Sequence, residues 1–98
     1  MRKIACITGA SSGIGRATAQ SLAKEGFQLI LCGRRKERLE ELKASLSVNS
    51  TILTFDVGDQ PSVIKAFESL PAEWKNIDVL VNNAGNAHGM SAIQDGDA

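Results

Sequence analysis

The sequence contains no tyrosine, which excludes any mechanism that uses a phenol as its proton donor or acceptor. It also has no excess charge, because 11 Lys and Arg residues balance 11 Asp and Glu residues. A neutral chain lacks the basic face that nucleic acids and anionic membrane surfaces attract. Its longest apolar runs are about five residues, whereas a helix needs roughly 20 to cross a bilayer. We therefore expect no nucleic-acid partner and no membrane partner.

Cysteine and histidine are also scarce. The two cysteines, Cys6 and Cys32, form no Cys-x-x-Cys motif, and each lies in an apolar run. We interpret them as small core residues of a protein from a reducing compartment, and we expect a cytoplasmic location. The single histidine, His88, has no second ligand at a metal-binding spacing, so we interpret it as a polar loop residue and expect no metal site.

The 98 residues suffice for one domain, and apolar runs alternate with amphipathic segments along them. Regular strand–helix alternation implies a parallel sheet with right-handed crossovers. The sequence predicts an α/β fold with a Rossmann-type sheet of strand order 3-2-1-4 and a ligand crevice between the first and fourth strands. We expect strands over residues 3–8, 28–32, 51–55 and 77–81, helices over 13–25, 36–47 and 60–70, and a loop-like tail over 86–98. In the third helix we expect Val63, Ile64, Phe67 and Leu70 to be buried.

A glycine-rich stretch joins the first expected strand to the first expected helix. Such a turn presents the free N–H groups of the helix to a pyrophosphate. We expect Gly9 to make the sharp turn, Gly13 to let the backbone approach the phosphates, and Gly15 to let the helix pack against the strand. The alternative is a tight turn without a ligand. The candidate phosphate-binding residues are Gly9, Ala10, Ser11, Ser12, Gly13, Ile14 and Gly15.

The end of the second expected strand lacks the carboxylate that usually holds the ribose 2′-hydroxyl of NAD. Arg34 and Arg35 follow Gly33 there instead. A guanidinium pairs well with a phosphate, so this replacement favours NADP over NAD as the cofactor. The alternative is a solvated helix start, and this is the interpretation we prefer for Lys36 and Arg38.

Polar segments also follow the third and fourth expected strands. Asp56 can accept a hydrogen bond from the adenine amino group while the Val57 backbone lines the same pocket. An ordinary carboxylate in a turn, without a ligand, is an equally weighted alternative.

The stretch Asn82-Asn83-Ala84-Gly85 ends the fourth strand beside the glycine-rich turn. Asparagine amides can lock a loop there and small residues leave room for a cofactor, although a plain turn is the alternative.

These three segments, in this order and at this spacing, resemble the short-chain dehydrogenase/reductase family. Within it, residues 33–39 and 70–78 look like the NADP-dependent 3-hydroxy acid (serine-type) dehydrogenases. The resemblance implies that the glycine-rich turn holds the phosphates of NADP. It further implies roles for individual residues: Arg34 with Ser11 or Arg35 for the 2′-phosphate, Asp56 and Val57 for adenine, Asn83 near the nicotinamide-side ribose, and Asn82 as support of the strand end.

The chain departs from the family pattern in its chemistry. Members transfer hydride with a serine and a Tyr-x-x-x-Lys pair located after the fourth strand, and a chain without tyrosine cannot supply that acid/base. The resemblance therefore implies that residues 1–98 are a partial dinucleotide-binding domain without catalytic residues, from an oxidoreductase of a small alcohol or 3-hydroxy acid. Full-length members usually form homo-oligomers. The alternative function is a non-catalytic nucleotide-binding module or interaction scaffold.

We predict that the isolated 98-residue chain is marginally stable, oligomeric or poorly soluble. Its fourth expected strand becomes a sheet edge with the apolar sequence Val79-Leu80-Val81, and exposed apolar edges recruit other chains. Sedimentation velocity measures the outcome. A sharp monomeric boundary together with a cooperative thermal transition would contradict the prediction.

Overall fold

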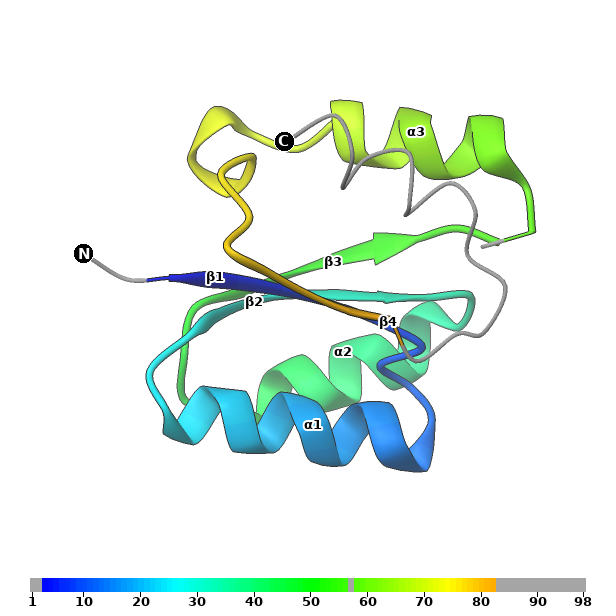
Figure 1. Ribbon diagram of the computed structural model, residues 1–98. Coiled ribbons are helices and arrows are strands. Elements are labelled where there is room, and N and C mark those ends of the chain that lie inside the picture. The colour runs from blue at the N-terminus through cyan, green and yellow to red at the C-terminus, as the bar shows by residue number, and fades with distance from the viewer. Residues whose placement is uncertain (1–2, 57, 83–98) are drawn as a thin grey trace.

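The computed structural model describes residues 3–56 and 58–82 as a four-stranded parallel sheet with helices on both faces. The strand order is β3-β2-β1-β4, which confirms the predicted fold. Helices α1 and α2 cover one face of the sheet and α3 covers the other (Figure 1). The elements are β1 (Ile4–Thr8), α1 (Gly13–Lys24), β2 (Gln28–Gly33), α2 (Lys36–Ser45), β3 (Ser50–Thr54), α3 (Gln60–Glu68), the 3₁₀ turn η1 (Ala72–Trp74) and β4 (Val79–Asn82).

Several predicted features lie outside the described residues. These are the adenine contact of Val57, the roles of Asn83, Ala84 and Gly85, the loop-like tail over 86–98 and the interpretation of His88. They remain predictions.

The central strand β1 divides the interior into two cores. All five of its residues are buried, as expected for a parallel strand that is covered on both faces. Successive side chains point to opposite faces. Ala5 and Ile7 therefore pack in the core under α1 and α2, whereas Ile4 and Cys6 pack in the core under α3.

The predicted burial of α3 is partly wrong. Val63, Phe67 and Leu70 are buried as expected, but the side chain of Ile64 is 37% exposed. The buried stripe of α3 runs through Val63 and Phe67, which are four residues apart, and Ile64 lies beside that stripe. The connector after α3 also contributes more than expected, because its turn η1 buries Trp74 in the same core.

The two cysteines are confirmed as free core residues. Neither Cys6 nor Cys32 is exposed, and their sulfur atoms lie 3.5 Å apart on the neighbouring strands β1 and β2. Burial raises the pKa of the Cys32 thiol well above its usual value, and the adjacent Cys6 raises it further. The Cys32 thiol is therefore kept protonated, and both thiols are shielded from solvent.

We predict that the native chain shows no rapidly reacting thiol, whereas the unfolded chain shows two. The thiolate is the reactive form, and burial both removes access and disfavours it. Folding raises the pKa of Cys32, so the unfolded chain loses this proton first as the pH rises. The protonated Cys32 therefore contributes fully to the free energy of unfolding below the unfolded pKa of about 8.5, and this contribution is lost as the pH rises above that value. Titration with an aromatic disulfide, with and without guanidinium, measures this. A fast-reacting thiol in folded protein at pH 7 would contradict the prediction.

Candidate functional site

The turn between β1 and α1 depends on a close contact between two glycines. Gly9 has a φ of 63°, in the left-handed region that disfavours a side chain. Its carbonyl oxygen accepts hydrogen bonds from the amide of Ser12 at 3.1 Å and the hydroxyl of Ser12 at 2.8 Å. A Cβ added at Gly15 would collide with that same carbonyl and would lie 2.9 Å from the Cα of Ala10. The first turn of α1 therefore packs directly on the strand end, as predicted for Gly15.

The N-terminus of α1 has backbone amides that are not hydrogen-bonded within the helix. Ser12 caps the helix, because its Oγ accepts the Gly15 amide at 3.1 Å and its carbonyl accepts the Arg16 amide at 2.8 Å. This leaves the amides of Gly13 and Ile14 without an acceptor inside the helix. A Cβ built on Gly13 meets no atom within 4 Å, and Ile14 is 74% exposed. Two N–H donors therefore remain at the positive end of the helix dipole, beside the open space at Gly13 and the exposed Ile14, and such a helix end favours an anion.

Two hydrogen bonds fasten this turn to its neighbours. The Ala10 amide donates to the carbonyl of Cys32 at the end of β2 at 3.0 Å. The Thr8 hydroxyl, which is fully buried, donates to Oδ1 of Asn82 at the end of β4 at 3.0 Å. Since β2 and β4 flank β1 where the strand order reverses, the turn lies at the switch point where open α/β sheets bind ligands. No role for Thr8 was predicted from the sequence, although its place directly before the glycine-rich turn was visible.

The carboxylate of Asp56 is held in a local turn. Its Oδ1 accepts the Gly58 amide at 2.9 Å, and its carbonyl oxygen accepts the Asp59 amide at 2.9 Å. This is the turn function weighed as one alternative. The next residue inward, Phe55, donates its amide to the Gly33 carbonyl at 3.1 Å, so Asp56 lies near the end of β2. The adenine contact remains a prediction.

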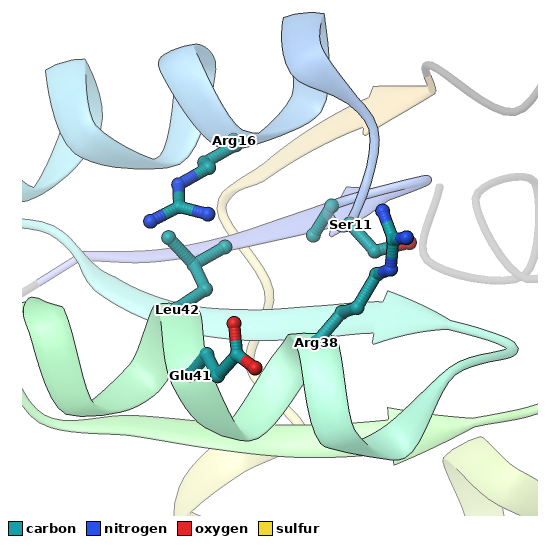
Figure 2. A pocket seen from close by; sticks show the side chains of 6 residues that line it. Ser11, Arg16, Arg38, Glu41 and Leu42 are labelled. Atoms are coloured by element: carbon teal, nitrogen blue, oxygen red, sulfur yellow. The ribbon is translucent and has the colours of Figure 1, made fainter.

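A pocket of about 210 Å³ lies beside the turn, between α1 and α2 (Figure 2). Arg34 and Arg35, which were predicted to bind phosphate, do not line this pocket. Both are exposed and precede α2, the helix that contributes Arg38 to the pocket. Arg38 does line it. The interpretation of Arg38 as a purely solvent-facing residue is therefore incomplete, because the side chain is exposed yet borders a pocket. The lining residues are Ala10, Ser11, Arg16, Arg38, Glu41 and Leu42.

Over residues 3–56 and 58–82, no group of three or more His, Cys, Asp or Glu side chains is placed to hold a metal ion. No helix in this part of the chain combines the length and the apolar character that crossing a bilayer would require.

The sequence profile of the short chain dehydrogenases matches residues 3–98. The chain belongs to the short chain dehydrogenase family. Among its relatives, the serine 3-dehydrogenase of Rhizobium radiobacter is 51% identical over 85 residues, which cover 87% of this chain and 34% of that enzyme. The NADP-dependent 3-hydroxy acid dehydrogenase YdfG of Escherichia coli strain K12 is 46% identical over 87 residues, covering 89% of this chain and 35% of that enzyme.

A solved short chain dehydrogenase has the same arrangement of elements. The closed form of a serine dehydrogenase complexed with NADP⁺ superposes with a TM-score of 0.79 at 45% identity, over 84% of this chain and 33% of that one. This confirms the Rossmann-type fold and the family that the motifs resemble. The chain spans about a third of the length of the curated relatives it matches.

We predict opposite effects of alanine at two glycines of the turn. Gly15→Ala should lower the free energy of unfolding by about 1–3 kcal/mol or more, because its methyl group collides with backbone. Gly13→Ala should leave it unchanged or raise it slightly, since its methyl group has free space and alanine favours a helix. Urea unfolding followed by far-ultraviolet circular dichroism compares the two variants. Equal losses in both would contradict the geometry described above.

Proposed function

We propose that this chain is the cofactor-binding part of an NADP-dependent oxidoreductase, which transfers hydride between NADP and a small alcohol or 3-hydroxy acid. The observation that carries the proposal is the N-terminus of α1 at the sheet's switch point, where Ser12 caps Gly15, the amides of Gly13 and Ile14 have no acceptor within the helix, and the space beside Gly13 is open. A pyrophosphate fits there because it accepts hydrogen bonds and carries negative charge. The NADP-dependent 3-hydroxy acid dehydrogenase and the serine dehydrogenases among its relatives support the cofactor and the substrate class.

The residues around this helix end suit the rest of a dinucleotide. The exposed side chain of Ile14 offers an apolar contact beside the phosphates. Asp56 uses Oδ1 in its turn, which leaves Oδ2 to accept the adenine amino group, with the Val57 backbone alongside. Thr8 holds Asn82 at the end of β4, so the following segment, Asn83-Ala84-Gly85, starts from a fixed point near the nicotinamide-side ribose.

The choice of NADP rests on the residues after β2. A Cβ built on Gly33 would lie 3.4 Å from Oγ of Ser11, so the glycine-rich turn and the strand end meet at this point. NAD-binding chains carry a carboxylate near here for the ribose 2′-hydroxyl, whereas this chain continues with Arg34 and Arg35. Guanidinium groups suit the 2′-phosphate of NADP, and a carboxylate would repel it.

When bound, the cofactor supplies or accepts the hydride, while the described residues bind and orient it. We assign no catalytic residue to residues 1–98, which we regard as one partial dinucleotide-binding domain, because the family's tyrosine does not occur in the sequence. For the parent enzyme we propose a homo-oligomer in the cytoplasm. Free core cysteines support the reducing location, and a half-buried apolar strand β4 at the end of the described sheet supports further association.

We predict that the chain binds NADPH at least about tenfold more tightly than NADH, which corresponds to one charge-assisted hydrogen bond to the 2′-phosphate. Arg34→Ala should remove most of this difference by weakening NADPH alone, and Gly13→Ala should weaken both cofactors by crowding the phosphates. Lys65→Ala is the control, because Lys65 lies on α3 across the sheet. Isothermal titration calorimetry measures all affinities.

Two results would overturn the proposal in different ways. Equal affinity for NADPH and NADH would refute the NADP assignment. Binding of neither cofactor by chain that unfolds cooperatively would refute the cofactor-binding function itself.

A further inference from the structure

Two hydrogen bonds from a single residue join the start of β4 to β1. The amide of Asp78 donates to the carbonyl oxygen of Ile4 at 2.9 Å, and Oδ2 of Asp78 accepts the amide of Ile4 at 2.9 Å. We propose that Asp78 is a positioning residue of the cofactor site, because it fixes the register of β4 and thereby places Asn82 beside Thr8. The inference rests on the proposed function and adds a residue to which the sequence pattern assigned no role.

The Asp78 carboxylate takes the place of a backbone carbonyl at the start of β1. Ile4 lies one residue before Ala5, whose partner Val79 is the first residue of β4. Ile4 is only 5% exposed, so its amide would be costly to leave without an acceptor. The side chain of Asp78 is exposed, so its charge stays hydrated while one oxygen serves this amide.

The apolar side chains of β4 do not fix its register by themselves. The strand has four residues, none of them fully buried, and it lies at one edge of the described sheet beside β1 (Figure 1). Leu80 packs against the core under α3, whereas Val79 and Val81 pack against the core under α1 and α2. A slip of one residue would exchange these faces and is excluded. A slip of two residues would keep every side chain on its face, so the apolar alternation does not exclude it.

The polar residues at the two ends of β4 exclude the slip of two residues. Leu80 lies opposite the buried Cys6 in the observed register. A slip of two residues would bring either Asp78 or Asn82 to that position, on the face that packs under α3. Burying a carboxylate or an amide there without a partner is unfavourable, and the charged group costs more. In the observed register Asp78 instead forms both of its bonds to Ile4.

The register of β4 decides what lies at the switch point. With Asp78 bound to Ile4, Asn82 lies opposite Thr8, and the Thr8 hydroxyl donates to its Oδ1 at 3.0 Å. A strand rises about 3.3 Å per residue, so a slip of two residues would carry Asn82 out of reach of this hydroxyl. Asp78 lies at the opposite end of the strand from the glycine-rich turn, so it acts on the cofactor site through Asn82.

The test combines amide hydrogen exchange by nuclear magnetic resonance with calorimetry of NADPH and NADH binding, both on the whole chain. Asp78→Ala should speed the exchange of the Ile4 amide at least about tenfold, the effect of one lost hydrogen bond, and should shift the side-chain signals of Asn82. It should weaken both cofactors by about three- to tenfold, because a smaller fraction of the chain holds the competent register. Asp78→Asn should retain the values of the unaltered chain, since an amide oxygen can accept the same bond. Glu73→Ala is the matched control, because it removes the same charge from an exposed residue of η1.

A double variant tests whether Asp78 acts through Asn82. Asn82→Ala should weaken both cofactors, and adding Asp78→Ala should then cause no further loss of affinity. A merely structural role of Asp78 would lower the affinity by the same factor in both backgrounds. Additive losses would therefore overturn the inference.

The other contrary outcomes separate this inference from the proposed function. Unchanged exchange of the Ile4 amide in Asp78→Ala, or equal losses of affinity in Asp78→Asn and Asp78→Ala, would overturn the inference alone. If Asp78→Ala does not unfold cooperatively, Asp78→Asn decides, because a loss of affinity or faster exchange in that variant would overturn the acceptor role. Binding of neither cofactor by the folded, unaltered chain would overturn the proposed function, and the signals of Ile4 and Asn82 would still show whether Asp78 fixes the register.

Discussion

The contact between Gly15 and the carbonyl of Gly9 is the constraint on which the rest of the site depends. A side chain at Gly15 would separate the first turn of α1 from the end of β1. With that contact in place, Ser12 caps the helix and the amides of Gly13 and Ile14 are left without an acceptor inside the helix. The donors are therefore oriented by backbone packing, and their direction does not depend on any flexible side chain.

The sheet fixes the position of this turn relative to the other parts of the site. The side chains of β1 pack in two separate cores, one on each face of the sheet. This packing fixes the position of the turn that follows β1. Its neighbours β2 and β4 end at the same edge and carry the residues assigned to the ribose and to the support of the next loop. Helix α2 lies against the same face that α1 covers, because Leu39 and Leu42 are buried in the core there.

Most of the fold was predictable because its determinants are local. Apolar runs of strand length, the glycine spacing and the strand–helix alternation together imply the order β3-β2-β1-β4. The exposure of Ile64 was not predictable, because an amphipathic pattern alone does not say how α3 is rotated on the sheet. The pocket position of Arg38 was missed for a related reason: it depends on how α1 and α2 lie relative to each other. The contacts assigned to Val57, Asn83, Ala84 and Gly85 remain predictions from the motifs.

The hydrogen bond from the Ala10 amide to the Cys32 carbonyl has a consequence for the thermodynamics of recognition. Together with the Thr8–Asn82 bond, it ties the glycine-rich turn to the strands on both sides. A turn held in this way has little conformational entropy left to lose when a ligand arrives. Interaction free energy that a mobile loop would spend on ordering itself is then retained as affinity, so the turn acts as a preorganised receptor.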